Sequence, residues 1–355
     1  MQERLESYRE VIDDALQQFF TDLPGQLDMD LSEYGQDALR KIEEYSLRPG
    51  KRIRGALACF AYDHITGQTN GKSGVQAAVA LELVQNYLLI VDDVMDRSAL
   101  RRGKPTIHEL YLAEQNQEPK DVHLANMLAI NVGLITQHLV NIVLTYEVTE
   151  NPSRVQQATL LLHKNIVATG FGQIEDACQH TGVKVSEQDI FRKYTLKSGY
   201  YTFVCPLQLG VVLAGKSDPE LLREITNFGL AAGIAFQLKD DLLGIFASTE
   251  TTGKPNTDDI EEGKYTLLVQ YALEHASEIE RRTLINLLGK QNVTEAEVLQ
   301  TQGILEKSGA KAYVEAKITE YAGQAKAVIA SSNFWDDRAK DVLTGIVTYS
   351  IERER

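Results

Sequence analysis

The sequence predicts an all-α protein, and three observations favour this fold class. None of the eight prolines lies after Pro255, so the rest of the chain has no helix breaker of this kind and is rich in Ala, Leu, Glu and Lys. Apolar residues recur at helical spacing in two long stretches, residues 80–95 and 231–245. The chain also lacks any sustained period-2 alternation bounded by turn residues, which is the pattern of a strand.

The two periodic stretches each predict a buried, central helix. In the first, the apolar residues follow the i, i+3, i+4, i+7 pattern at Ala80, Leu83, Val84, Tyr87, Leu88, Val91 and Met95. In the second, they stand at Ala231, Ile234, Ala235, Leu238, Leu242 and Ile245. Polar breaks separate the predicted helices at residues 48–50, 67–74, 102–105, 115–120, 150–153 and 248–263.

None of these breaks has the length or biased composition of a domain linker. We therefore expect a single domain over residues 1–355, with a motif-bearing core at about residues 40–290 and peripheral helices at both ends. The longest and most polar break, residues 248–263, has the size of a surface loop that closes over a site.

Composition excludes several functional classes. With 36 Lys and Arg against 50 Asp and Glu, the net charge is −14, which argues against binding nucleic acid over the whole surface. The three cysteines, Cys59, Cys178 and Cys205, form no Cys-x-x-Cys pair and fit a reducing compartment. No apolar run reaches the length of about 18 residues that a membrane span needs, and the charged N-terminus lacks a secretory apolar region. These features predict a cytoplasmic protein without a membrane span.

Acidic residues stand at the end of both periodic stretches. Asp92 and Asp96 are one helical turn apart and so project from the same face, with Asp93 between them. Carboxylates placed together repel unless a cation joins them, and Mg²⁺ bridges one or two carboxylates to substrate phosphates. A solvated acidic helix end is the alternative, although the helix dipole disfavours anions at a C-terminus. Asp240 and Asp241 follow the second stretch, where they can face the first group across a helical bundle and share a metal cluster.

Basic residues concentrate in two short segments, 48–54 and 97–104. The segments hold eight of the 36 basic residues of the chain, namely Arg48, Lys51, Arg52, Arg54, Arg97, Arg101, Arg102 and Lys104. Arg suits bidentate recognition of phosphate, and Lys acts as a point charge. A solvated basic loop would explain either segment alone. Beside the carboxylates, they favour a magnesium-bound diphosphate next to a second anion that the basic residues bind directly.

The order of these motifs resembles that of the trans-isoprenyl diphosphate synthases, the polyprenyl synthetase family. Residues 82–96, followed by Arg-Arg-Gly at 101–103, are similar to the family's first aspartate-rich motif, and residues 50–54 to its Gly-Lys-Arg-x-Arg element. Further similar elements follow in the family's order at residues 172–176, 197–198, 236–241, 253–254 and 262–264. The similarity spans residues 48–268 and resembles the short-chain type, the geranylgeranyl and farnesyl diphosphate synthases. It implies a helical bundle of the isoprenoid synthase type with a central active-site cavity.

The resemblance implies a role for each matching residue. Magnesium, as three ions when diphosphate is bound, would be held by Asp92, Asp96 and Asp240, supported by Asp93 and Asp241. The allylic diphosphate (dimethylallyl, geranyl or farnesyl) would be bound by Arg101, Lys197, Lys254 and Lys264. Isopentenyl diphosphate would be bound by Lys51, Arg54, Arg102 and Gln85. The reaction centre would be lined by Gln173, Ser198 and Gln237, and the catalytic set would be Asp92, Asp93, Asp96, Arg101, Lys197, Gln237 and Asp240.

Four positions depart from the family pattern. Gly244 replaces the last aspartate of the second motif, which predicts a weaker second metal site or one that binds through water. Gln85 stands where many bacterial relatives have His, and Ser198 replaces the usual Thr. The pair Gly133-Leu134 replaces a common Gly-Asp, which we interpret as structural.

The residues before the first aspartate motif bear on product length. Tyr87 lies five residues before Asp92, where a bulky residue shortens the product in the family, while Leu88 is not aromatic and the motif lacks a two-residue insertion. This combination resembles archaeal geranylgeranyl synthases, so we expect magnesium-dependent, head-to-tail prenyl transfer to geranylgeranyl diphosphate by a homodimer. The alternatives are a farnesyl diphosphate synthase, a non-catalytic subunit of a heteromeric prenyl synthase, and a terpene cyclase, which needs no second basic clamp. At Tyr87 itself, simple packing in the core is the alternative.

Overall fold

The computed structural model describes residues 2–147, 151–180, 182–247 and 257–352. It is 79% helical, and the strands of the described residues are one antiparallel pair, which confirms the all-α prediction. The chain divides into two compact units, which we call the N-terminal unit (residues 2–161 and 206–217) and the C-terminal unit (162–205 and 218–355). The expected single domain over residues 1–355 stays a prediction.

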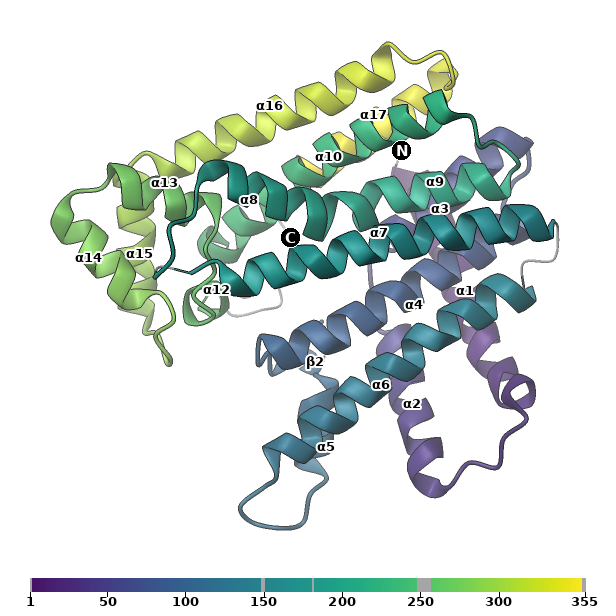
Figure 1. The fold of residues 1–355 in the computed structure, drawn as a ribbon, viewed down its shortest axis with the longest axis horizontal. Helices are drawn as coiled ribbons and strands as arrows, with labels where there is room; N and C mark the ends of the chain where they lie inside the picture. The colour runs from purple at the N-terminus through teal and green to yellow at the C-terminus, as the bar shows by residue number, and fades with distance from the viewer. Residues whose placement is uncertain (1, 148–150, 181, 248–256, 353–355) are drawn as a thin grey trace. The chain divides into compact units, whose positions relative to one another are not determined.

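The N-terminal unit is built around helix α4 (Lys72–Met95), which contacts α1, α3 and α6 (Figure 1). Its elements are α1 (Gln2–Leu27), α2 (Glu33–Leu47), α3 (Ile53–Thr66), α4, β1 (Leu100–Arg101), β2 (Lys104–Pro105), α5 (Ile107–Ala113), α6 (Val122–Ile142), the π-helix η1 (Val143–Glu147), the start of α7 (Pro152–Cys178) and most of α9 (Cys205–Leu213). Gly133 lets α6 approach α4, because a Cβ there would lie 2.9 Å from Cγ2 of Val91. This contact supports the structural interpretation of Gly133.

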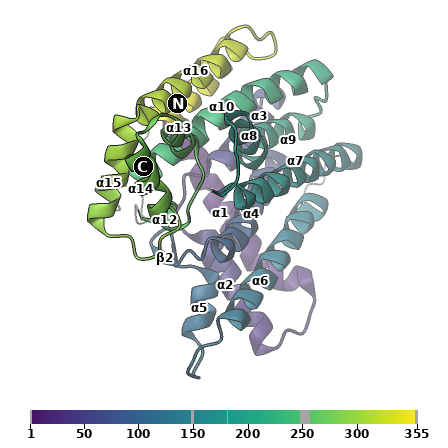
Figure 2. The same ribbon diagram turned by 60° about the vertical axis from the view of Figure 1, so that its left-hand side comes forward.

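The C-terminal unit is built around α10 (Pro219–Phe246), which packs against α16 (Ala310–Ala330) (Figure 1). Its other elements are the rest of α7, α8 (Glu187–Tyr194), the π-helix η2 (Thr195–Val204), α12 (Asp258–Glu261), α13 (Leu267–His275), α14 (Glu278–Leu287), α15 (Glu295–Lys307) and α17 (Asp337–Glu352). Helices α13 and α15 each contact both α10 and α16 (Figure 2). A Cβ at Gly233 would lie 2.5 Å from Cα of Gly199, so η2 and α10 touch through their backbones. Such π-helical segments are frequent at functional sites.

Polar residues at the helix starts explain where several of these helices begin. Ser186, Ser277 and Thr294 each form a capping box with the acidic residue three positions later, at the starts of α8, α14 and α15. Asp218 caps α10, and Pro219 stands in its first turn, where a missing N–H costs nothing. Local sequence therefore determines these boundaries.

Two helical segments are long and apolar enough to cross a membrane, judged by length and composition alone. They are Lys72–Met95 and Val122–Thr145, and 67% and 44% of their most apolar windows are buried within the structure. The core helix of a soluble protein passes the same test, so the finding is weak evidence for a span. The expected absence of a membrane span stays a prediction.

Candidate functional site

The aspartate motif of the N-terminal unit lies at the C-terminal end of α4, as predicted. Asp92 and Asp96 are half-buried, and the N–H of Asp96 donates to the carbonyl of Asp92 (2.8 Å) and so caps the helix. Asp93 is fully buried and accepts hydrogen bonds from Tyr45 Oη (2.9 Å) and Arg101 Nε (2.7 Å). The motif therefore presents two carboxylates near the surface and a third that protein groups hold.

Arg101 of strand β1 is a fixed cation beside this motif. It pairs with Asp93, and its Nη2 lies 3.6 Å from Oδ2 of Asp92. Burial works to lower the pKa of the guanidinium, but the charge and hydrogen bond of Asp93, together with the charge of Asp92, outweigh burial, and the pKa of Arg101 lies above its ordinary value. Asp92, which is expected to bind a metal, and Arg101, which is expected to bind diphosphate, are thus brought together.

Arg102 and Gly103 form the turn between the two strands, and both have positive φ, 55° and 73°. Positive φ is unfavourable for Arg, so contacts must hold it, and its Nη1 donates to the carbonyl of Arg48 (3.1 Å). A Cβ at Gly50 would come within 3.2 Å of this guanidinium, so the glycine allows its approach. Burial and the charge of Arg52 lower the pKa of Arg102. A bound anion would relieve the positive charge gathered here.

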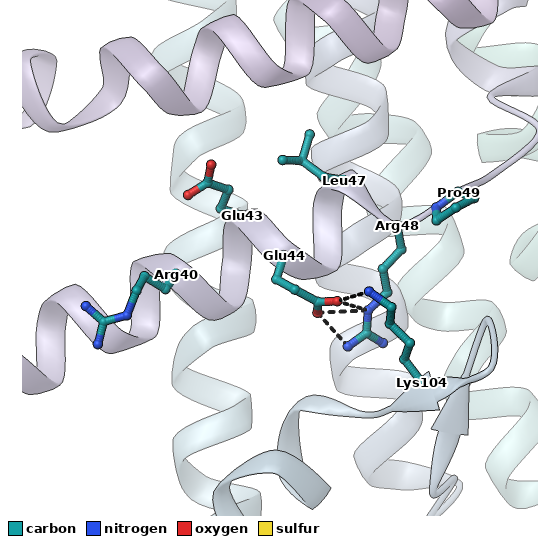
Figure 3. Close-up of a pocket in the computed structure, with 7 residues that line it drawn as sticks. All are labelled: Arg40, Glu43, Glu44, Leu47, Arg48, Pro49 and Lys104. Carbon is teal, nitrogen blue, oxygen red and sulfur yellow. Dashed lines mark hydrogen bonds and ion pairs between the residues drawn. The ribbon is translucent and has the colours of Figure 1, made fainter.

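A pocket of 330 Å³ beside the hairpin is lined by Arg40, Glu43, Glu44, Leu47, Arg48, Pro49 and Lys104 (Figure 3). In it the Glu44 carboxylate lies between Arg48 Nη2 and Lys104 Nζ, each at 2.7 Å (Figure 3). Burial works to raise the pKa of Glu44, but these cations outweigh it and the pKa is lowered. Arg48 also donates to the carbonyls of Arg101 (3.3 Å) and Pro105 (2.9 Å). These charges fasten the hairpin to α2, so we interpret the pocket as support for the site.

The other basic residues of segment 48–54 differ in their surroundings. Arg52 is buried, has a positive φ of 49°, and pairs with Glu82 of α4 (2.9 Å). Arg54 Nη1 donates to Oε1 of Gln85 (2.8 Å), which joins two residues expected to bind the same diphosphate. Lys51 is exposed beside them. Within this segment, Arg52 therefore fixes the turn between Lys51 and the start of α3, the helix that carries Arg54.

In the C-terminal unit, Lys197 at the start of η2 forms an ion pair with Asp176 of α7. A Cβ at Gly172 would lie 2.3 Å from the backbone nitrogen of Lys197, so the glycine of the Gly-Gln motif allows the two helices to touch. Asp176 also pairs with Lys193 (2.9 Å), whose buried Nζ donates to the carbonyl of Tyr265 (2.8 Å). Burial works to raise the pKa of Asp176, but the two lysines outweigh it and hold the pKa well below its usual range. Sequence reasoning missed Lys193, whose one signal is its place a helical turn before Lys197.

A chain of hydrogen bonds joins three predicted residues of this unit. Ser198 Oγ donates to Gln237 Oε1, Gln237 Nε2 donates to Asp241 Oδ1 (2.8 Å), and Tyr194 Oη donates to the other oxygen of Asp241. Burial raises the pKa of Asp241 to about 6. Asp240 beside it is half-buried. We expected the pair to follow the helix, but it lies inside α10, because the apolar stripe of the helix continues past the pair.

Two more of the predicted residues, Lys264 and Tyr87, lie within the described part of the chain. Lys264 pairs with Asp259 (2.8 Å) and Glu262 (2.6 Å), Tyr87 is buried in α4, and Lys254 lies outside the described residues. Among the described residues, no group of three or more His, Cys, Asp or Glu side chains is placed to hold a metal ion. Magnesium is commonly bound through one or two carboxylates, with substrate phosphates and water completing its shell. The acidic pairs have the composition that such an ion requires.

Comparison with known proteins gives one consistent result. The polyprenyl synthetase family model matches residues 36–305. The chain is 29% identical over 350 residues to a short chain isoprenyl diphosphate synthase of Methanothermobacter thermautotrophicus, covering 99% of this chain and 98% of that protein. It is 30% identical over 305 residues to a geranylgeranyl diphosphate synthase of Methanosarcina mazei, covering 86% of each. A crystal structure of geranylgeranyl pyrophosphate synthase from Corynebacterium glutamicum, complexed with isoprenyl diphosphate and magnesium, is similar with a TM-score of 0.88 and 28% identity, covering 98% of this chain and 99% of that one.

Proposed function

Because the chain is a prenyltransferase of the polyprenyl synthetase family, we propose that it condenses isopentenyl diphosphate head-to-tail with an allylic diphosphate and that geranylgeranyl diphosphate is the main product. The observation that carries this proposal is the gathering, at one end of α4, of half-buried carboxylates and half-buried guanidinium groups. Carboxylates suit a metal-bound diphosphate, and guanidinium groups suit a second diphosphate bound directly. Prenyl transfer needs both, since one diphosphate leaves while the other stays on its substrate.

Magnesium fits the donor set of the proposed site. Asp92, Asp96 and Asp240 would hold it, as three ions with diphosphate bound, and the similar Corynebacterium protein was crystallised with magnesium and isoprenyl diphosphate. When bound, magnesium neutralises the leaving diphosphate and so favours ionisation of the allylic ester. Arg101 and Lys197 add fixed positive charge for the same diphosphate.

The second diphosphate has its own set of residues in this proposal. Isopentenyl diphosphate is bound by Lys51, Arg54 and Arg102. The Arg54–Gln85 hydrogen bond fixes two of the residues that bind it relative to each other. Holding this substrate in a fixed orientation supplies much of the rate, because it replaces a bimolecular encounter with an aligned pair. No nucleophilic side chain is required.

We assign the limit on product length to Tyr87, which is buried on α4 before the aspartates. Tyr87→Ala would open the path of the growing chain, so we expect products at least one isoprene unit longer. Tyr87→Phe keeps the ring and serves as the matched control, with unchanged products expected. Product analysis by mass spectrometry measures both, and equal product lengths in Tyr87→Ala and the wild type would leave Tyr87 as a core residue only.

A homodimer fits an exposed apolar stripe on α6. Met127, Ile130 and Leu134 lie on one face of this helix and are 45%, 41% and 49% exposed. Changing Ile130 and Leu134 to Glu together is expected to give monomers in sedimentation equilibrium, while Gln17→Glu on the exposed side of α1 is expected to leave the assembly intact. A double variant that sediments like the wild type would contradict this face as the interface.

The same proposal includes expectations about domain organisation, location and partners. The chain would form one polyprenyl synthetase domain, and it would work in the cytoplasm without a nucleic-acid partner or a membrane span. Three free cysteines, two of them buried, support the location, since a reducing compartment keeps thiols free.

The direct test is an assay of the purified chain with isopentenyl diphosphate, magnesium and each allylic diphosphate in turn. A twenty-carbon main product is expected. A fifteen-carbon product would instead indicate a farnesyl diphosphate synthase. No condensation with any allylic partner would contradict the proposal and favour a non-catalytic subunit of a heteromeric enzyme.

A further inference from the structure

Gly244 of α10 stands where the second acidic motif lacks its last carboxylate, and a neighbouring side chain fills the space it leaves. A Cβ built at Gly244 would lie 1.9 Å from Oδ2 of Asp259 and 2.9 Å from its Cγ. Atoms that are not bonded to each other cannot come this close, so a side chain at 244 and the present position of Asp259 exclude each other. The carboxylate of Asp259 occupies the place next to α10 that a side chain at 244 would otherwise take.

The position of Asp259 is fixed from several sides. Its Oδ1 accepts from Lys264 Nζ (2.8 Å), so Oδ2 is the oxygen that faces α10. The next residue, Ile260, is fully buried, and its carbonyl accepts from the N–H of Gly289 (2.7 Å). A carboxylate anchored in this way holds its direction without rearrangement.

We propose that Asp259 supplies the second metal site with the carboxylate that residue 244 does not provide. The inference rests on the proposed function, because it assumes a magnesium-bound diphosphate at Asp240. Residues 240 and 244 are one helical turn apart on the same face, so Oδ2 of Asp259 lies beside the face that carries Asp240. Carboxylate oxygens are the ligands that magnesium prefers in proteins. The second motif thus keeps its number of carboxylates, although the sequence at Gly244 predicts one fewer.

A purely supporting role is the competing explanation, in which Asp259 only holds Lys264 for the diphosphate. The two explanations differ in what the carboxylate changes. If Asp259 binds the metal ion, its loss raises the ion concentration that is required for binding. If Asp259 only holds Lys264, its loss weakens diphosphate binding at any ion concentration.

The test measures binding of Mn²⁺, a stand-in for magnesium with the same preference for oxygen ligands, together with inorganic pyrophosphate. Isothermal titration calorimetry and the spin-resonance signal of free Mn²⁺ give the half-saturating ion concentration for each variant without turnover. Asp259→Asn keeps the shape and a partner for Lys264, and it is expected to raise this concentration about tenfold. Asp258→Asn, the adjacent carboxylate of α12, is the matched control and should leave it unchanged.

A relocated carboxylate completes the design. The double variant Gly244→Asp with Asp259→Ala moves the carboxylate onto α10 without a clash, and it should return the half-saturating concentration to within about twofold of wild type. Lys264→Met should weaken pyrophosphate binding and leave the ion requirement unchanged. The inference is overturned if Asp259→Asn has the ion requirement of the wild type, or if Lys264→Met raises that requirement as much. A wild-type chain that binds no Mn²⁺ with pyrophosphate would contradict the proposed function as well, so the two failures are distinguishable.

Discussion

The acidic pairs of α4 and α10 are built alike, although they lie in different units of the chain. In each pair the first aspartate is half-buried and the second is buried. In each, a tyrosine hydroxyl donates to the buried carboxylate, Tyr45 to Asp93 and Tyr194 to Asp241. Each pair thus has one carboxylate near the surface and a buried neighbour that hydrogen bonds from other protein groups hold in place.

The pairs differ in what balances the buried charge. Asp93 has a guanidinium partner, Arg101, whose Nε donates to it at 2.7 Å. Asp241 receives its side-chain hydrogen bonds from neutral donors, and burial raises its pKa to about 6. A buried carboxylate with a cation beside it remains charged. A buried carboxylate with only neutral donors is stabilised less against the loss of water, so its pKa rises. The pair on α4 is therefore held by charge and the pair on α10 mainly by hydrogen bonds.

The largest expected effect is a loss of catalytic rate when the first aspartate of either pair is replaced. Asp92→Ala and Asp240→Ala each remove a proposed metal ligand from a half-buried position, and we expect kcat to fall by about a thousandfold or more. Thermal stability should change by no more than about 0.5 kcal/mol, because neither carboxylate is buried. Steady-state kinetics with magnesium and thermal unfolding of the same preparations measure both. Activity retained in either variant would remove that residue from the metal site.

The second prediction compares the stability lost when the buried aspartate of each pair, Asp93 or Asp241, is replaced. Asp93→Asn leaves the half-buried Arg101 beside a neutral group, and we expect a loss of about 3 kcal/mol of unfolding free energy. Asp241→Asn exchanges a carboxylate with neutral donors for an amide of the same shape, and we expect a loss of about 1 kcal/mol. Urea unfolding followed by circular dichroism measures the difference. Equal losses in the two variants would show that the contrast between charge and hydrogen bonding is wrong.

Much of this site was predictable from sequence, because helix periodicity and motif spacing are local properties. The first aspartate motif lies at the end of a predicted helix, and Arg102 lies in a predicted break between helices. Residue type and spacing alone could not separate Arg48 and Arg52, which fasten backbone segments, from Arg54 and Arg102, which only the resemblance to the family assigned to a ligand. All four are arginines near Gly or Pro, and contacts between distant segments show the supporting role of Arg48 and Arg52. Sequence patterns did not identify Lys193 for the same reason, since its partners are 17 and 72 positions away.

The smallest expected effect concerns the two tyrosines and sharpens the comparison. Tyr45 donates one hydrogen bond, to Asp93, whereas Tyr194 both donates to Asp241 and accepts from the N–H of Leu267 (3.0 Å). Tyr45→Phe is expected to cost about 1 kcal/mol, since Arg101 still satisfies the carboxylate, and Tyr194→Phe about 2.5 kcal/mol, since it also leaves a buried N–H without its partner. Urea titration gives both values, and hydrogen exchange at the amide of Leu267 should quicken only in Tyr194→Phe. If Tyr45→Phe proved the more damaging of the two, the guanidinium would not be what holds Asp93, and the pair on α4 would depend on its tyrosine as the pair on α10 does.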